Sequence, residues 1–224
     1  GNPRWVVERV RPVGGVVYHD VTEAKWARKG LDGGVDGLIA VNSRAGGHAG
    51  GKSAEVLLEE LRSFGVPVVC AGGVGDEHDF VRMLGLGYDG CQLGTRFIAT
   101  PECTASDAYK AAIIAADEDD IILSERLTGV PVAVIDTPVI RRMGTRAGPL
   151  ARWMLRGRRT KHWMRTIYAL KSLWQLKRSL KGDNEYWQAG RSVRGIHAIE
   201  PVGAIVRRFA AALAADHDGA TRHP

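Results

Sequence analysis

Four short apolar runs alternate with segments of helical periodicity through the first hundred residues of this chain. The runs are rich in β-branched side chains and occupy residues 14–19, 37–41, 66–71 and 90–94. Because their apolarity is nearly continuous, they predict strands buried on both faces, as in a parallel sheet that packs against helices. The alternation therefore predicts an α/β fold built from consecutive βα units.

The segments between the runs carry signals for where helices begin and end. Candidate N-caps precede three helical stretches: Thr22, Ser53 and Asp76. Glycines that can end the same helices follow them: Gly30, Gly65 and Gly85 or Gly87.

Asp36 and Asp89 each stand one residue before a predicted strand. In a βα barrel the strand-start face serves stability rather than chemistry, so we expect a structural role for both carboxylates.

Glycine-rich turns follow three consecutive predicted strands. They read AGGHAGG at 45–51, AGGVGDE at 71–77 and LGTRF at 93–97. Because the carboxyl ends of parallel strands meet at one edge of a sheet, the turns predict a place where backbone N–H groups approach a phosphate-bearing ligand. The sequence has no GxGxxG after its first predicted strand, no P-loop and no cluster with metal-ligand spacing, so we expect no metal site.

His48 lies among the glycines of the first turn. Taken alone, a histidine in such a turn is more often a hydrogen-bonded structural residue than a catalyst. From this turn alone, both interpretations stay open.

The net charge of +6 is concentrated in one segment. Residues 141–181 contain 13 Lys and Arg and no acidic residue, which leaves 18 basic and 25 acidic residues, a net charge of −7, elsewhere. Residues 150–182 read as one or two helices with Trp153, Trp163 and Trp174 near a common face. We expect these tryptophans to pack on the barrel or on a second subunit, and we expect no nucleic-acid partner. Binding of an anionic membrane surface, a nucleic acid, or an acidic carrier or CoA-type substrate is the alternative.

Composition indicates an ordinary globular protein of the cytoplasm. The chain has 45% hydrophobic and 25% charged residues, and no segment reads as a signal peptide or a membrane span. The cysteines are three in number and lack paired spacing, so we expect reduced packing residues at Cys70, Cys91 and Cys103.

Several motifs together resemble one family. The run DGLIAVNSRAGGHAGG at 36–51, the run from VPVVCAGGVGDE to GTRFIATPEC at 66–103, and the shorter YKAAI and GVPVAVI resemble the nitronate monooxygenases, formerly grouped as 2-nitropropane dioxygenases. Residues 186–209 match the closing segment of these enzymes more weakly. The family consists of FMN-dependent βα barrels.

The resemblance implies that the chain is the C-terminal half of a TIM (β/α)8 barrel, with strands 5–8, followed by a helical basic segment. It implies four parts: a half-barrel at 1–140, the basic segment at 141–182, a closing segment with a packed helix at 183–215, and a disordered tail at 216–224. Such a fragment would lack strands 1–4 and expose edges at 16–18 and 91–93. We expect it to be inactive alone unless it pairs with the missing half or another copy.

The resemblance also implies roles for individual residues. His48 matches the active-site histidine that abstracts a proton from a nitroalkane or orients the nitronate. The FMN contacts would be Ala45, Gly46, Gly47, Ala71, Gly72, Gly73, Gln92, Gly94 and Thr95. Among these, Gly72, Gly73, Gly94 and Thr95 would form the phosphate cradle, and Arg96 would either add charge there or form a salt bridge on the barrel surface.

This chain departs from the family where many members carry an acidic residue at the Arg44 position and a glycine or glutamine pair at Asn42 and Ser43. Arg44 and Asn42 are therefore candidate substrate contacts, and Arg44 suits an anionic substrate. The implied reaction is FMN-dependent oxidation of nitronates or nitroalkanes by O₂ to a carbonyl compound and nitrite. The alternatives are an FMN-dependent NAD(P)H reductase of the enoyl-acyl-carrier-protein or quinone type, and an inactive fragment whose basic helices bind an anionic surface. We leave open a homo-oligomer.

Overall fold

The computed structural model describes residues 2–126, 129–146 and 186–220, and the side chains of these residues except 217–220. The basic segment with its three tryptophans lies almost entirely outside the described residues. The chain divides into two compact units. Unit 1 comprises Gly1–Ala45, Ala49–Leu93 and Ile205–Pro224, and unit 2 comprises Gly46–His48 and Gly94–Ala204.

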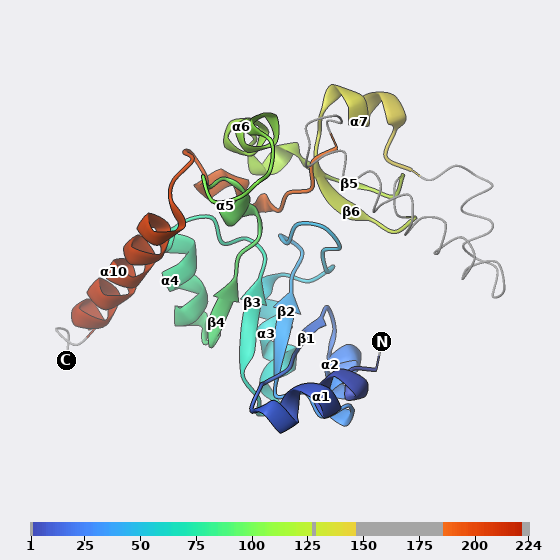
Figure 1. The fold of residues 1–224 in the computed structure, drawn as a ribbon, viewed down its shortest axis with the longest axis vertical. Helices are drawn as coiled ribbons and strands as arrows, with labels where there is room; N and C mark the ends of the chain where they lie inside the picture. The colour runs from blue at the N-terminus through green and yellow to red at the C-terminus, as the bar shows by residue number, and fades with distance from the viewer. Residues whose placement is uncertain (1, 127–128, 147–185, 221–224) are drawn as a thin grey trace. The chain divides into compact units, whose positions relative to one another are not determined.

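Unit 1 is built on a four-stranded sheet in the order β1-β2-β3-β4 (Figure 1). Its strands are β1 (Tyr18–Val21), β2 (Gly37–Val41), β3 (Val68–Ala71) and β4 (Gly90–Gln92). All three neighbouring pairs are parallel, which confirms the predicted α/β fold with a parallel sheet. The register places Ala40 beside Cys70 and Ala71 beside Gln92.

Three helices connect these strands. They are α2 (Ala24–Asp32), α3 (Ala54–Arg62) and α4 (Glu77–Leu86). Helix α2 contacts β1 and β2, α3 contacts β2 and β3, and α4 contacts β4. Because right-handed crossovers between successive neighbouring strands all pass on the same side, the strand order places the three helices on one face of the sheet.

The first strand begins later than predicted. The apolar run starts at Gly14, but Gly14 is the left-handed C-cap of the short 3-10 helix η1 (Arg11–Val13), which follows α1 (Arg4–Val10). Pairing with β2 starts near Val17, whose carbonyl accepts a hydrogen bond from the Asp36 N–H at 2.8 Å. Val16 is 68% exposed and lies outside the strand, because the helical turn before it occupies the residues that would have extended the pairing.

Two of the three predicted helix caps are confirmed. Ser53 accepts a hydrogen bond from the Val56 N–H, and Asp76 accepts one from the Asp79 N–H at 2.9 Å. The prediction of Thr22 is wrong, because α2 begins one residue later with Glu23 at the N-cap and without a side-chain cap.

Of the predicted helix ends, one is confirmed and another is wrong. Gly87 ends α4 in the left-handed region at φ 104°, as expected for a C-cap glycine. Gly30 lies inside α2, which continues to Asp32, so the prediction that Gly30 closes this helix is wrong. Gly30 instead packs against the His19 ring, where a Cβ would come within 2.8 Å of the ring, so its small size serves packing inside the helix.

Asp36 and Asp89 have the predicted structural role. The Asp36 carboxylate accepts the Val17 N–H at 2.7 Å, and the Asp89 carboxylate accepts the Val68 N–H at 2.7 Å. The hydrogen bond from Val17, helped by the Arg11 guanidinium, lowers the pKa of Asp36 from its ordinary value. Each carboxylate therefore holds the start of the preceding strand.

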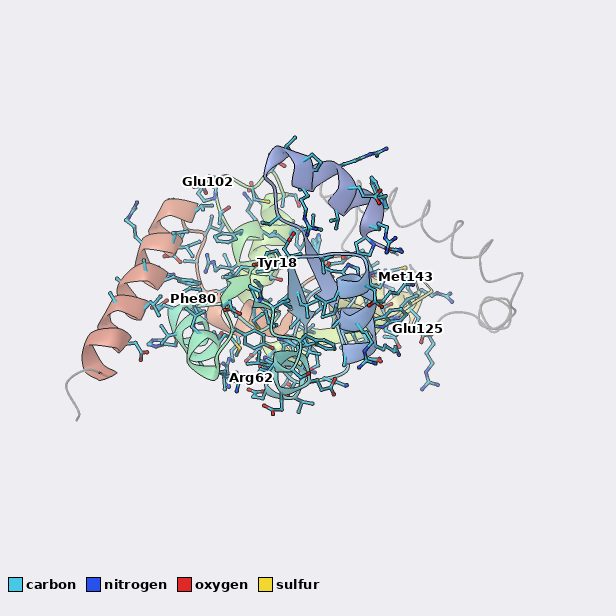
Figure 2. The ribbon with its side chains drawn as sticks, turned by 90° about the horizontal axis from the view of Figure 1, so that it is seen from below. Tyr18, Arg62, Phe80, Glu102, Glu125 and Met143 are labelled. Atoms are coloured by element: carbon cyan, nitrogen blue, oxygen red, sulfur yellow. The ribbon has the colours of Figure 1, made fainter. Side chains whose placement is uncertain are left out.

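Helix α10 (Val202–Ala220) contributes its later residues to unit 1. The Phe209 ring lies 5.2 Å from the Phe80 ring of α4, and Arg208 pairs with Glu77 at 2.9 Å. Figure 2 shows Phe80 on the side of α4 that faces α10. The disordered tail predicted at 216–224 is wrong for residues 216–220, which are helical, because the alanine-rich run before them favours continued helix.

Unit 2 contains an antiparallel pair of strands and several short helices. The strands are β5 (Ile121–Ser124) and β6 (Val132–Ile135), which pair in antiparallel register (Figure 1). The helices are α5 (Thr95–Ile98), α6 (Asp107–Ala115), η2 (Glu118–Asp120), α7 (Pro138–Met143) and η3 (Arg191–Gly195). Tyr109, Ile113, Ile135 and Trp187 belong to its main apolar core.

Candidate functional site

In unit 1, a buried amide joins the turns that follow β2 and β3. Asn42 is fully buried, and its Nδ2 donates to the Gly72 carbonyl at 2.9 Å and to Cys70 Sγ at 3.5 Å. Its Oδ1 accepts the Arg44 N–H at 2.8 Å. The hydrogen bonds of Asn42, predicted as a substrate contact, therefore hold these two turns together.

The turn after β3 is compact because of two glycines in the left-handed region. Gly72 has φ 116° and Gly73 has φ 84°. A Cβ on Gly72 would lie 2.5 Å from the Ala45 nitrogen, so the backbones of the two turns approach too closely for any side chain. Within the described residues, the N–H groups of Gly72 and Gly73 have no recorded acceptor. Such N–H groups in a glycine turn suit an anion.

The remaining predicted residues of unit 1 lie beside these turns. Arg44 is half-buried and extends over Gly73, where a Cβ would meet its Cδ and Nε at 3.0 Å. Ala45 and Ala71 are buried, and Gln92, the register partner of Ala71, is exposed at the end of β4. The structure thus brings Asn42, Arg44, Ala45, Gly72 and Gly73 together.

In unit 2, the short segment Gly46–His48 is held against β6. The Ala133 N–H donates to the Gly47 carbonyl at 2.7 Å, and the two residues form an antiparallel bridge. Gly47 has φ 66°, a conformation that favours glycine. The backbone before His48 is therefore fixed, whereas the His48 side chain is exposed.

Gly94 and Thr95, the predicted phosphate-cradle residues of unit 2, begin α5. Gly94 is exposed, and a Cβ there would meet no atom within 4 Å. Thr95 is buried, and its hydroxyl oxygen accepts the Gly190 N–H at 3.0 Å. A hydroxyl that accepts one hydrogen bond still has a proton to donate.

Arg96 forms a salt bridge inside unit 2. Its side chain is 1% exposed, donates to the Ala198 carbonyl at 2.8 Å and lies 3.6 Å from a Glu200 carboxylate oxygen. The second of the two roles expected for Arg96 is therefore the one observed, although this salt bridge is buried.

Residues 186–190 lie against the segment Gly46–His48, and sequence reasoning did not predict this. A Cβ on Gly46 would lie 2.9 Å from the Gly190 nitrogen, and a Cβ on Gly47 would lie 3.4 Å from Gln188 Oε1. Trp187 stacks on Tyr109 at 6.0 Å, and its carbonyl accepts the Ile135 N–H at 2.9 Å. The only local signal was the aromatic pair before Gln-Ala-Gly, because the contacts link residues more than 50 positions apart.

The described residues contain no group of three or more His, Cys, Asp or Glu side chains that could hold a metal ion. Among the described helices, none combines the length and apolarity needed to cross a membrane.

Comparison with known proteins gives a family. The nitronate monooxygenase family model matches residues 1–210. A nitronate monooxygenase of Neurospora crassa is 35% identical over 124 residues, which cover 51% of this chain and 33% of the relative. A (3aS,4S,5R,7aS)-5-hydroxy-7a-methyl-1-oxo-octahydro-1H-indene-4-carboxyl-CoA dehydrogenase of Mycobacterium tuberculosis is 32% identical over 148 residues, which cover 63% of this chain and 42% of the relative.

Solved structures are also similar to this chain. A nitroalkane oxidase of Streptomyces ansochromogenes is 27% identical, with a TM-score of 0.77 over 96% of this chain and 62% of that protein. FabK of Thermotoga maritima is 25% identical, with a TM-score of 0.79 over 100% of this chain and 69% of that protein. The chain spans less than half the length of both relatives found by sequence. Because the family model matches nearly the whole chain, this chain belongs to the nitronate monooxygenase family.

Proposed function

We propose that the protein oxidises nitronates or nitroalkanes with FMN and O₂, releasing a carbonyl compound and nitrite. The observation that carries this proposal is the family match over residues 1–210, which includes the three glycine-rich turns and His48. A small planar anion is the substrate class, and Arg44 beside the turn after β3 favours a substrate with negative charge.

The backbone of unit 1 fits a phosphate group. Gly72 and Gly73 present N–H groups without an acceptor among the described residues, and a side chain at Gly72 would fill the turn. We propose that Gly72, Gly73, Gly94 and Thr95 hold the FMN phosphate. Ala45, Gly46, Gly47, Ala71 and Gln92 remain the other proposed FMN contacts. FMN would supply the electron transfer between substrate and O₂.

His48 is the proposed base. Its backbone is fixed through the hydrogen bond from Ala133 to Gly47, while its imidazole is exposed. An imidazole nitrogen can accept a proton, so His48 is suited to take the proton from the carbon next to a nitro group or to hold the nitronate already formed. Asn42 has an indirect role in this proposal, because its amide holds the turns of unit 1 and does not project to solvent.

The sheet of unit 1 supports the proposal of a half-barrel. A strand order that follows the chain, with all crossovers on one face, is what four consecutive βα units of a TIM barrel produce. A doubly wound sheet would instead reverse its strand order and place helices on both faces. We therefore propose that β1–β4 correspond to strands 5–8 of the family's barrel.

The test uses the whole protein that contains these residues, loaded with FMN. We expect His48→Ala to reduce kcat/KM for nitroethane by about 100-fold or more, because general-base catalysis contributes that much. Turnover of the preformed ethyl nitronate should fall less, since that substrate needs no proton removal. The matched control is His197→Ala, an exposed histidine of unit 2, which should leave both rates unchanged. Equal turnover of nitroethane by wild type and His48→Ala would refute the role of His48.

A second candidate is dehydrogenation of a CoA ester. It is favoured by the Mycobacterium tuberculosis relative, which covers more of this chain than the Neurospora crassa nitronate monooxygenase does. Arg44 suits an anionic CoA ester as well as a nitronate. Anaerobic mixing separates the candidates: bleaching of bound FMN by ethyl nitronate supports the monooxygenase. Bleaching by an acyl-CoA alone supports the dehydrogenase, and bleaching by NADPH alone supports the reductase alternative.

A further inference from the structure

Gln188 in unit 2 is a polar residue whose backbone is held on several sides. Its carbonyl accepts a hydrogen bond from the Tyr109 hydroxyl, and Gln188 forms an antiparallel bridge with Val134. The carbonyl of the preceding Trp187 accepts the Ile135 N–H at 2.9 Å. Since Tyr109 and Trp187 belong to the core of unit 2, this backbone has little freedom to move.

The same strand also holds the segment that carries His48. Ala133 is bonded to Gly47, and its neighbour Val134 is bridged to Gln188. Strand β6 therefore fixes the two segments relative to each other. The two segments approach closely: if Gly47 carried a Cβ, that atom would lie 3.4 Å from the Gln188 amide oxygen. The Gln188 carboxamide thus lies beside the residue that precedes His48.

The hydrogen-bonding groups of this carboxamide are unused within the described part of the chain. Gln188 is half-buried, and no hydrogen bond of its side chain to a described residue is recorded. A carboxamide carries two N–H donors and one acceptor, and a half-buried amide without partners costs free energy unless water or a ligand satisfies it. A fixed backbone, unused donors and a position beside the segment that carries His48 together are the features of a substrate-binding group.

We propose that Gln188 is a substrate-positioning residue whose carboxamide donates a hydrogen bond to the anionic oxygen of the substrate. This inference rests on the proposed function, in which His48 acts on the carbon next to the nitro group. A nitronate spreads its charge over two oxygens, and a neutral amide N–H stabilises that charge by donating a hydrogen bond while it keeps its proton.

The experiment compares two variants of nearly equal size in the whole, FMN-loaded protein. Gln188→Leu removes the donors and retains the volume, and Gln188→Glu retains the shape and places a negative charge at the same point. The readouts are KM and kcat for ethyl nitronate, the inhibition constant of propionate as an unreactive anion of similar shape, the FMN dissociation constant and the thermal unfolding midpoint. His197→Ala again serves as the control, because that side chain is exposed elsewhere in unit 2.

We expect Gln188→Leu to raise both the KM for ethyl nitronate and the inhibition constant of propionate by about 10- to 100-fold, the loss typical of a hydrogen bond to a charged group. The kcat, the FMN affinity and the unfolding midpoint should stay close to the wild-type values. Gln188→Glu should bind propionate more weakly still at neutral pH and recover part of the affinity as the pH falls, because protonation removes the repulsion.

Other results would overturn the inference. Unchanged KM and propionate inhibition in Gln188→Leu, with a normal wild type, would remove the role of Gln188 and leave the proposed function intact. Loss of FMN affinity or of thermal stability in both variants would assign Gln188 a structural role instead. A wild type that binds FMN but turns over no nitronate would refute the proposed function, and this inference with it.

Discussion

At the scale of single residues, Asn42 is the clearest case of a buried polar side chain that holds two turns in shape. Its amide is fully buried and bonds to Gly72 of one turn and to the Arg44 N–H of the other. Its own carbonyl also accepts the Gly50 N–H at 3.1 Å. The conformation of both turns therefore depends on one side chain that is itself inaccessible to a ligand.

We expect Asn42→Ala to lower the free energy of unfolding by about 2–4 kcal/mol, because it leaves the Gly72 carbonyl and the Arg44 N–H without their partner inside the protein. Urea denaturation at neutral pH measures this change. FMN affinity should fall as well, since Gly72 and Gly73 are proposed phosphate ligands. Ser43→Ala is the matched control, because Ser43 is the exposed neighbour of Asn42 and should tolerate the change. Equal unfolding midpoints for wild type and Asn42→Ala would contradict the structural role.

Residues whose role is local were predictable from the sequence, and residues whose role is distant were not. Ser53 and Asp76 cap helices through hydrogen bonds to N–H groups three residues ahead, which a short window of sequence reveals. Gln188 meets Gly47 across about 140 positions, and no periodicity links the two. Asn42 was predicted as part of the site, but its burial could not be foreseen because it depends on the packing of a neighbouring strand.

At the scale of elements, the parallel sheet of unit 1 followed from its pattern of apolar runs, whereas the hairpin of unit 2 did not. Each run of unit 1 is bounded by glycines and a helical stretch, so its neighbours along the chain are also its neighbours in the sheet. Strand β6 is different, because it pairs with β5, with Gly47 and with Gln188. The bridges from β6 to Gly47 and to Gln188 link segments more than 50 positions apart, and contacts over such distances leave no local signature.

The segment Gly46–His48 gives a prediction at this scale. A Cβ on Gly46 would lie 2.9 Å from the Gly190 nitrogen and 3.1 Å from the Ala189 carbonyl carbon, and both are backbone atoms that cannot rotate away. We therefore expect Gly46→Ala to separate the segment from residues 189–190 and to destabilise the protein by about 1–3 kcal/mol, the usual cost of overpacking. Hydrogen exchange of the Gly190 N–H, which bonds to Thr95, should become faster.

Gly51→Ala provides the matched control for that experiment. Gly51 is exposed, and a Cβ there would meet no atom within 4 Å. The control should therefore leave the exchange rate of Gly190 and the unfolding midpoint unchanged. If Gly46→Ala behaved like Gly51→Ala, the close approach between the segment and residues 189–190 would be refuted.

At the scale of the whole molecule, the reactivity of the three cysteines measures how well each unit shields its interior from solvent. All three are free: Cys70 is fully buried beside Asn42, Cys91 is partly buried on β4, and Cys103 packs in part against the core of unit 2. Burial raises the pKa of Cys70 to about 11 and that of Cys91 to about 12. Because the thiolate is the reactive form, a raised pKa protects both thiols of unit 1.

A chromogenic disulfide reagent tests the order in which the three thiols react. With a pKa of about 11, roughly one Cys70 thiol in a thousand is ionised at pH 8, so in the native protein we expect Cys103 to react first and Cys70 and Cys91 to react slowly. The rates of the two slow thiols should rise about tenfold per pH unit while the pH stays below their pKa values, and all three thiols should react at once after unfolding in guanidinium. Cys103→Ser should remove the fast phase alone. Rapid reaction of Cys70 in the native protein would mean that the sheet of unit 1 opens readily, with the Asn42 network open as well.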